Sequence, residues 1–472
     1  MLKKLVGHTA VYGLAPRIPQ LASLFILPLI MPYLSDVDFG VFGLITAYVG
    51  GFRLLSSFGL NVTLANAFYK SRSQYRWKWK QILAVQHLGN LILQPLIVAP
   101  VIYLSCPAEA RENVWTIVVL NITAPILFGN LANVTAMHYQ LSQKPFPIAI
   151  RVGSLGLLSV GLNYYFIAEM RMGYMGWFWS GFIVGMLTNI SYLYPFFRTL
   201  RLTPIYRFRW RYIKKDLKVG LPTIPHQYSN YLLNISDRVV MQQLGVSTSR
   251  LGRYNLAASF GTYFDSFSDA LTRVTGPLQM KSYAAGKFLE ARELIFTAQT
   301  GFFLLTFTFS FWAKEIFEVL IDNESLKTVY PLAIVIVMSY NYRPMYSGAA
   351  SMYFFSENTK LLWRISFIAG MGNLLLNFAL IPVFGYETAA YTTFLGFMWM
   401  GYSGYFYKAF KERQRLNYYP LRWLLATVLL TVLAYIGVEW GLELKITAYI
   451  GFLLGIAFMF YLIQVRKIFS DE

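Results

Sequence analysis

The sequence predicts an all-α polytopic membrane protein with fourteen transmembrane helices, and three observations support this fold class. The 472 residues are 56% hydrophobic and only 13% charged, with a mean hydropathy of +0.46, which is typical of a chain dissolved in lipid. Apolar stretches of about 20 residues, the length that crosses a bilayer as a helix, recur along the whole chain. The polar connections between these stretches are too short to form a domain of their own.

The predicted helices follow one another with short loops. We place them at about 9–34, 39–68, 82–104, 115–137, 147–168, 176–197, 218–244, 254–280, 294–312, 329–355, 361–382, 388–407, 421–438 and 446–465. Most of the 41 Lys and Arg residues then fall on one side of the membrane, which the positive-inside rule identifies as cytoplasmic. Both termini are therefore expected in the cytoplasm.

An internal repeat predicts two six-helix lobes. GLAPRIPQ at 13–20 and GLPTIPHQ at 220–227 each open a proline-bearing span, which leads through a short outer loop to Gly-x-aromatic in the next span. The copies lie six spans apart, so the repeats are parallel. We expect an N-terminal lobe at 1–197 (spans 1–6), a basic cytoplasmic linker at 198–217, a C-terminal lobe at 218–407 (spans 7–12), and extra spans 13–14 within 408–472.

Several function classes are disfavoured. The net charge of +19 gathers in clusters such as YRWKWK at 75–80, next to predicted spans, where basic and aromatic residues anchor a protein at the headgroups. A nucleic-acid partner is therefore not expected. The single cysteine, Cys106, and four scattered histidines offer no metal-ligand spacing. No nucleotide-binding loop is found, so ATP is not expected as the direct energy source.

Charged residues inside the apolar spans point to a binding site. FDSFSDALTR at 264–273 carries Asp265, Asp269 and Arg273 one turn apart, and arginines also interrupt other spans. A charge at mid-membrane costs about 2.5–3.5 kcal/mol even on insertion scales, so these groups face one another or water. We favour a positive, water-filled cavity that binds phosphate oxygens, formed by Arg17, Arg53, Arg273 and Arg343. A purely structural network, including an Asp269–Arg273 pair along the helix, stays open as the alternative.

Span 7 carries a polar stripe on one helix face. Its members are spaced by four, four and three residues: His226, Asn230, Asn234 and Asp237. Such a stripe points away from lipid, and Pro222 and Pro225 are expected to weaken the helix near its inner end. Ordinary proline kinking with interhelical hydrogen bonds remains the structural explanation of this pattern.

At these motifs the chain resembles the Wzx-type polysaccharide flippases. LNISDRVVMQQLG followed by LGRYNLAASF is similar to their seventh-to-eighth span region, and YLSDVDFGVFGL fits their first two spans. The segment at 358–393 is similar to their eleventh-to-twelfth span region, where Lys360, Asn373, Asn377, Pro382 and Gly385 match. The resemblance covers most of the chain, with one departure at residues 386–388.

The resemblance implies the fold of the multidrug/oligosaccharidyl-lipid/polysaccharide exporter superfamily, in which two lobes enclose a cavity that opens alternately to each side. It implies a cavity lined by arginines on spans 1, 2 and 8, where Arg17, Arg53 and Arg273 lie here. It also implies an outer gate at Asp38 or Asp36, and a groove for the lipid tail at spans 13–14.

We therefore predict a flippase of the bacterial cytoplasmic membrane that is not an enzyme. Its substrate would be an undecaprenyl-pyrophosphate-linked glycan, and its partners membrane lipids and other glycan-assembly proteins. Asp237, Asp265 and Asp269 would bind a coupling Na⁺ or H⁺, or hold the arginines between substrates; no other cofactor is expected. The alternatives are a cation-coupled multidrug exporter of the same fold and a membrane-embedded glycosyltransferase or polymerase.

Overall fold

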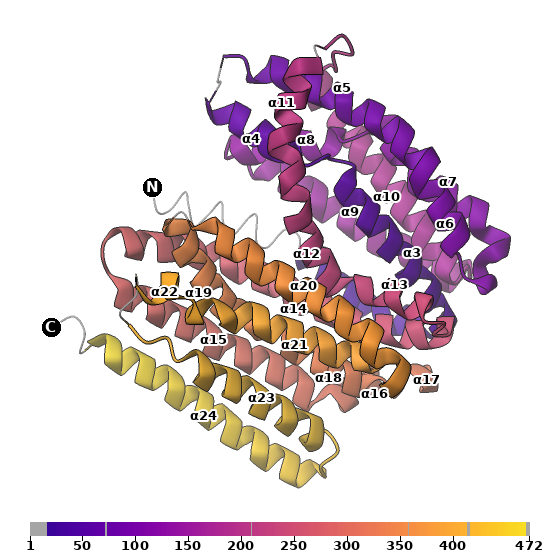
Figure 1. The fold of residues 1–472 in the computed structure, drawn as a ribbon. Helices are drawn as coiled ribbons and strands as arrows, with labels where there is room; N and C mark the ends of the chain where they lie inside the picture. Colours follow the sequence, from indigo (N-terminus) through magenta and orange to yellow (C-terminus); the bar gives the residue numbers. More distant parts are fainter. Residues whose placement is uncertain (1–16, 71–72, 209, 357, 413–415, 469–472) are drawn as a thin grey trace. The chain divides into compact units, whose positions relative to one another are not determined.

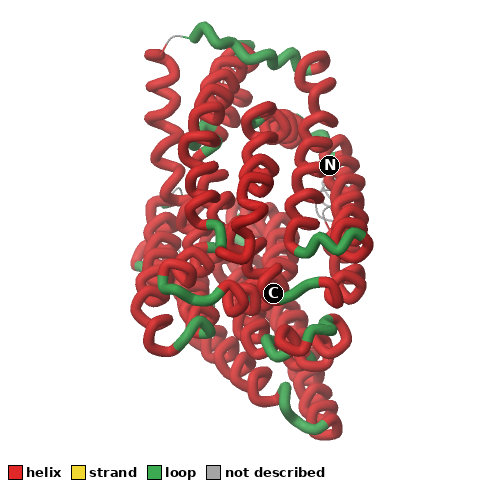
Figure 2. The backbone as a smooth tube through the Cα atoms, turned by 90° about the vertical axis from the view of Figure 1, so that its right-hand side faces the viewer, coloured by secondary structure: helices red, strands yellow, loops and turns green. Residues whose placement is uncertain are grey.

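The computed structural model describes residues 17–70, 73–208, 210–356, 358–412 and 416–468, all in helices and short connections without any strand (Figures 1 and 2). Seven helices of this described part are long and apolar enough to cross a membrane, and eight if the bent pair at 108–141 is one span. The predicted all-α membrane fold is confirmed, whereas the number of fourteen spans and the orientation stay predictions.

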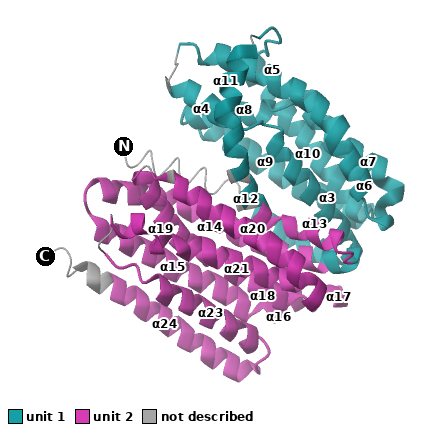
Figure 3. Cartoon of the chain, viewed as in Figure 1, with its two compact units in different colours: residues 1–231, 247–252 teal, residues 232–246, 253–472 magenta. Residues whose placement is uncertain are grey.

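The chain forms two units, residues 1–231 with 247–252 and residues 232–246 with 253–472 (Figure 3). The predicted division into two lobes, a linker and two extra spans is not tested by these units and stays a prediction. Unit 1 contains α2 (Arg17–Ile30), α3 (Asp36–Leu55), α4 (Asn61–Lys70), α5 (Tyr75–Leu93), α6 (Ala99–Ser105), α7 (Val114–Phe128), α8 (Leu131–Leu141), α9 (Phe146–Tyr164), α10 (Tyr174–Tyr194), α11 (Trp210–Gly220) and most of α12 (Ile224–Asn234).

Unit 2 contains the remaining helices. They are α13 (Ser236–Gln243), most of α14 (Thr248–Ala284), α15 (Phe288–Phe311), α16 (Ala313–Leu320), α17 (Glu324–Lys327), α18 (Tyr330–Ser339), α19 (Tyr342–Phe355), α20 (Thr359–Phe384), α21 (Thr388–Tyr402), α22 (Lys408–Lys411), α23 (Pro420–Gly437) and α24 (Leu442–Ile468). The first turns of α14 belong to unit 1.

Several predicted spans are broken helices. Span 2 divides into α3 and α4 around Gly59, which has a φ of +67° and packs so closely on Gly220 that a Cβ would lie 2.1 Å from its carbonyl oxygen. Only glycine fits such a left-handed close approach. Span 7 breaks at the 3₁₀ turn Leu221–Thr223, beside the predicted weak point at Pro222 and Pro225, and again between α12 and α13. Span 10 breaks between α18 and α19.

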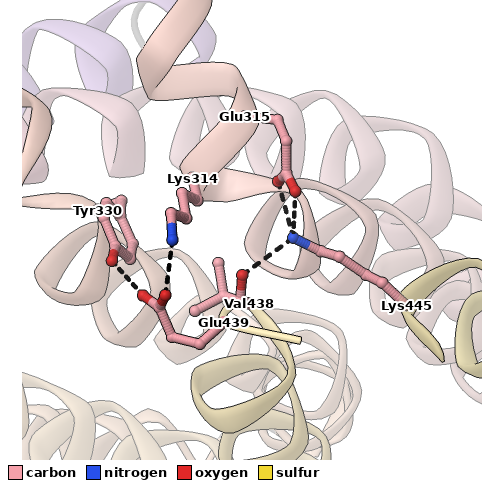
Figure 4. A network of polar contacts seen from close by, with 6 residues as sticks. All are labelled: Lys314, Glu315, Tyr330, Val438, Glu439 and Lys445. Atoms are coloured by element: carbon pink, nitrogen blue, oxygen red, sulfur yellow. Dashed lines mark hydrogen bonds and ion pairs between the residues drawn. The ribbon is translucent and has the colours of Figure 1, made fainter. Parts of the chain in front are cut away.

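The C-terminal hairpin of α23 and α24 packs along α15 in unit 2 (Figure 1). Phe307 and Phe311 of α15 form an apolar cluster with residues of both hairpin helices. Polar contacts fasten the hairpin turn to α16 (Figure 4): Lys445 Nζ lies 2.5 and 2.8 Å from the two carboxylate oxygens of Glu315 and donates to the Val438 carbonyl at 3.1 Å. This hairpin corresponds to the predicted extra spans 13 and 14.

Candidate functional site

An arginine held by two carboxylates lies within unit 2. Arg343 is the second residue of α19, directly after the break in span 10. Its Nη2 donates to Asp265 on α14, and its Nη1 lies 3.9 Å from an oxygen of Asp269. The Arg343 side chain is 20% exposed, against 34% for Asp265 and 54% for Asp269. A cation that keeps its charge at any physiological pH is thus placed beside acids that remain accessible.

The two acids of FDSFSDALTR therefore pair with an arginine of another helix, and not with the arginine of their own helix. Both acids lie against Arg343, which comes from another helix, while Arg273 is exposed one turn beyond Asp269 on α14. The structure brings together three of the predicted site residues. It places Arg273 on the same helix as the two acids, outside these two ion pairs.

Asp237 forms a second charged centre in unit 2 and is 1% exposed. One carboxylate oxygen accepts hydrogen bonds from Tyr254 at 2.5 Å and Thr393 at 3.0 Å. The other oxygen accepts from Asn377 Nδ2 at 2.7 Å. Three neutral donors from α14, α21 and α20 therefore surround this carboxylate, which compensates part of the cost of burying it.

More amide and hydroxyl oxygens lie around Asp237. Asn373 is one turn from Asn377 on α20, and its amide lies 3.1 Å from the Thr393 hydroxyl. Thr392 donates to Asn377 Oδ1. No group of three or more His, Cys, Asp and Glu suited to a metal occurs in the described ranges. The mixed set of carboxylate, amide and hydroxyl oxygens is nevertheless of the kind that hard cations accept as ligands.

Arg238 follows Asp237 and is also buried, at 8% exposure. Its Nε donates to Asn255 Oδ1 at 2.9 Å, and its Nη1 to the Asn234 carbonyl at 2.8 Å. The Asn234 side chain accepts from Tyr340 at 3.4 Å. Two members of the predicted polar stripe, Asn234 and Asp237, thus lie in one buried polar region.

The remaining members of the stripe are His226 and Asn230. Both belong to α12, and their side chains lie outside the described part of the structure. The same holds for the side chain of Arg17, the first residue of α2.

The predicted outer-gate residues lie at the start of α3, where both make specific contacts. Asp36 accepts a hydrogen bond from Ser249 at 2.5 Å. Asp38 accepts from the Tyr174 backbone N–H at 2.7 Å and, with Ser35, forms a capping box. Asp38 therefore fixes the backbone at Tyr174, and Asp36 joins α3 to the start of α14 through the Ser249 hydroxyl.

Two glycines allow α3 and the first turns of α14 to touch. A Cβ on Gly252 would lie 1.7 Å from the Asp36 carbonyl oxygen, and one on Gly40 would lie 2.0 Å from that of Thr248. These are the glycines of the two Gly-x-aromatic motifs that the internal repeat predicted. The motif therefore serves close backbone packing at this contact in unit 1.

Arg53 lies in the last turn of α3 and is exposed. It lines two neighbouring cavities of unit 1. Arg53 thus belongs to unit 1, whereas Arg273 and Arg343 belong to unit 2. The convergence of these arginines and Arg17 on one pyrophosphate stays a prediction.

The sequence reading missed a row of buried amides in unit 1. Gln86, Asn90 and Gln94 have exposed fractions of 0%, 1% and 5%. They recur every four residues, which places them on one helix face. The same spacing argument that found the stripe of span 7 also finds this one.

Comparison with known proteins identifies the family of the chain and its fold. Residues 5–277 match the family model described as polysaccharide biosynthesis protein. No curated protein is significantly similar in sequence. A mutant of the MATE transporter VcmN of Vibrio cholerae has a TM-score of 0.59 at 13% identity, covering 88% of this chain and 98% of that one.

Two further solved structures are similar over nearly their whole length. An inward-facing MATE family multidrug transporter of the MOP superfamily has a TM-score of 0.59 at 16% identity, covering 89% of this chain and 95% of that one. The lipid II flippase MurJ, in an inward closed conformation, has a TM-score of 0.57 at 13% identity, covering 91% and 97%. At such identities the likeness concerns the fold alone, and it confirms the predicted exporter-superfamily fold.

Proposed function

We propose that this chain, which belongs to the polysaccharide biosynthesis protein family, is a flippase for a lipid-linked oligosaccharide. The substrate is an undecaprenyl-pyrophosphate-linked glycan, which moves from the cytoplasmic to the outer leaflet of a bacterial cytoplasmic membrane by alternating access. Other glycan-assembly proteins supply the substrate inside and consume it outside.

The observation that carries this proposal is the position of Arg343 between Asp265 and Asp269. A guanidinium inside an apolar segment needs a negative partner at all times. The two acids supply it, but they are partly exposed, so a pyrophosphate can approach and replace them. The bidentate fit of guanidinium to phosphate oxygens favours this exchange. Arg17, Arg53 and Arg273 complete the anion site.

The Asp237 centre supplies the coupling step. A bare buried carboxylate is costly, and the neighbouring Arg238 offsets only part of that cost, so protonation or cation binding stabilises Asp237 further. Uptake of H⁺ or Na⁺ there changes the hydrogen bonds that tie α13 to α14, α20 and α21. Cation binding on one side of the membrane and release on the other would then drive the conformational cycle.

The contact between α3 and the start of α14 acts as the outer gate. Opening toward the outside requires the backbones at Gly40 and Gly252 to separate and the hydrogen bond between Asp36 and Ser249 to break. The small residues allow a tight seal, and the hydrogen bond between Asp36 and Ser249 is weak enough to break repeatedly.

Replacement of the proposed phosphate ligands tests the function. Arg53→Ala, Arg273→Ala and Arg343→Ala are each expected to lower translocation about 10- to 100-fold, since a charge-assisted hydrogen bond contributes about 1.5–3 kcal/mol. Translocation is measured in proteoliposomes as the appearance of lipid-linked oligosaccharide in the opposite leaflet. Arg111→Ala, at an exposed arginine of the 3₁₀ turn at 108–113, is the matched control.

Full activity in all three variants would remove the phosphate site. Loss of drug resistance with unchanged glycan translocation would support the multidrug exporter instead. New glycosidic bonds formed by the purified chain would support a transferase or polymerase.

A further inference from the structure

The amide stripe of unit 1 continues into a network that joins four helical segments. Gln86 Nε2 donates to the Ser57 carbonyl at 3.0 Å, and Asn90 Nδ2 donates to the Gln86 carbonyl at 2.8 Å. Gln94, the first residue of the π-helix Gln94–Val98, donates to Asn90 Oδ1 at 3.2 Å. The amides of the stripe therefore bond to one another and to the backbone of the turn between α3 and α4.

Three asparagines extend this network to α4 and α8. Asn130 Nδ2 lies 3.3 Å from Gln86 Oε1 and 3.4 Å from Asn61 Oδ1. Asn133 Nδ2 donates to Asn130 Oδ1 at 2.7 Å. Gln86 and Asn130 are buried, Asn61 is half-buried and Asn133 is exposed. The network thus begins in the core of the unit and ends at a partly exposed edge.

That edge borders a cavity of about 450 Å³ whose polar lining is mainly amide. Asn61, Asn90, Asn130 and Asn133 line one side. Asn189 of α10 lines the other, its Nδ2 bonded to the Gly185 carbonyl at 2.9 Å. Amide side chains of α4, α5, α8 and α10, and Asn130 just before α8, therefore line one open cavity.

A second cavity, of about 290 Å³, adjoins the first and has an aromatic lining. Trp177, Phe42 and Phe52 are among its lining residues, and the rings of Phe42 and Trp177 lie 4.9 Å apart. The two cavities share Arg53 and Ser56. Arg53 therefore stands where the amide-lined and aromatic-lined spaces meet.

This combination selects a chemical class of ligand. Amides donate and accept at once, as sugar hydroxyls do, and they carry no charge that would demand a counter-ion. Aromatic faces pack against the apolar faces of sugar rings. A drug-like cation would instead call for carboxylates, and an acyl chain would leave the amides unpaired at a cost. The two spaces are also of the size of small-ligand sites, about 300–1,000 Å³.

We propose that the joined cavity of unit 1 binds the sugar next to the pyrophosphate, a neutral hexopyranose, while Arg53 binds the adjoining phosphate. The inference rests on the proposed function and adds the part of the substrate that unit 1 recognises. The amide-lined space holds the hydroxyl groups, and the aromatic-lined space holds a face of the ring.

Binding is measured by native mass spectrometry on the full chain in detergent. The probes are undecaprenyl pyrophosphate alone and the same lipid bearing glucose, galactose or N-acetylglucosamine. We expect at least one sugar-bearing probe to bind about tenfold more tightly than the bare lipid, which corresponds to about 1.4 kcal/mol.

Two variants at the cavity edge locate the effect. Asn133→Leu and Asn189→Leu keep the side-chain size but remove the amide, and each is expected to abolish most of the sugar-dependent gain. Binding of bare undecaprenyl pyrophosphate should change less than twofold. Asn163→Leu in α9 is the matched control, because this asparagine lines neither cavity. Melting temperatures verify that the variants fold.

The outcomes distinguish failure of the sugar site from failure of the flippase proposal. Equal binding of bare and sugar-bearing lipids by the unaltered chain overturns the sugar site but leaves the flippase proposal intact. Unchanged sugar dependence in both leucine variants likewise overturns it. If the folded chain binds none of the four lipids, the proposed function and this inference fail together.

Discussion

The polar interiors of the two units differ mainly in how many charged side chains they bury. In unit 1, buried Gln86, Asn90 and Asn130 bond to one another and to backbone groups. In unit 2, buried amides such as Asn377 also occur, and charged side chains are present as well, as at Asp237 and Arg343. A neutral network is complete at any pH and needs no ion, whereas a buried charge requires a compensating partner. Under the proposed function, we expect unit 1 to recognise the neutral sugar, with Arg53 at the adjoining phosphate, and unit 2 to take up the coupling cation.

Replacing Asp237 by Asn is the strongest test of this division. The variant keeps the shape but loses the carboxylate, so no cation or proton is taken up. We expect translocation to fall about 100-fold, the equivalent of about 2.7 kcal/mol, and its dependence on an Na⁺ or pH gradient to disappear. Translocation into proteoliposomes with each gradient applied in turn measures both.

Asn90→Asp in unit 1 is the counterpart of that experiment. It places a carboxylate into the neutral network, where the amide now donates to the Gln86 carbonyl. If Asn90→Asp restores gradient dependence to the Asp237→Asn variant, or if Asp237→Asn alone retains it, the separation of roles between the units is wrong.

The sequence predicts the fold class and many of these residues because their signals are local. Apolar length and composition identify membrane helices, and the spacing in span 7 leads directly to Asp237 and Asn234. The charged segment at 264–273 is likewise found without a structure. Each of these predictions needs only the periodicity of a helix.

What the sequence does not predict is which partner each charge finds. Asp265 and Asp269 bond to Arg343, about 75 residues away, and not to Arg273 in the next turn. The pairing depends on the break between α18 and α19. Pro344, in the first turn of α19, marks that break because a proline cannot bond to the carbonyl four residues earlier, at Tyr340, but it does not indicate which acids Arg343 contacts. Tertiary packing, which composition does not encode, decides it.

Breaking the pair between Glu315 and Lys445 tests how much stability is lost when a buried charge in unit 2 loses its partner. The Lys445 side chain is fully buried, while Glu315 is 40% exposed. Glu315→Gln leaves the ammonium with neutral acceptors, and we expect a loss of about 2 kcal/mol, less than for a fully buried pair because water screens Glu315. The apparent melting temperature in detergent measures it. Glu324→Gln, at the 86% exposed partner of Lys327, is the control and should change little.

Removing an amide from unit 1 should cost less than removing that acid from unit 2. Gln86→Leu loses the hydrogen bond to the Ser57 carbonyl and the acceptor for Asn130. We expect about 1 kcal/mol of destabilisation, since Asn130 keeps Asn61 as a partner and a neutral hydrogen bond contributes about that much. Unfolding of Gln86→Leu and Glu315→Gln under the same conditions gives the comparison. A larger loss of stability for Gln86→Leu than for Glu315→Gln would contradict the expectation that a broken charge pair in unit 2 costs more than a lost amide in unit 1.

The smallest expected effect concerns Glu439, in the turn between α23 and α24. Hydrogen bonds from Lys314 and Tyr330 lower the pKa of Glu439 below its ordinary value of 4.5 (Figure 4). A lowered pKa in the folded state means that the stabilisation is complete above pH 4.5 and is lost as the pH falls through the folded-state pKa.

Because the Glu439 side chain is 52% exposed, solvent and salt screen this contact, and we expect only about 0.5 kcal/mol. Glu439→Gln should therefore lower the melting temperature slightly at pH 7 and not at all below the folded-state pKa. The difference should shrink in high salt, whereas that of Glu315→Gln should persist because Lys445 is buried. Equal salt sensitivity of the two variants would contradict this expectation. It would mean that solvent reaches Lys445 as easily as Glu439, so that the charged contacts at this end of unit 2 are not protected by burial.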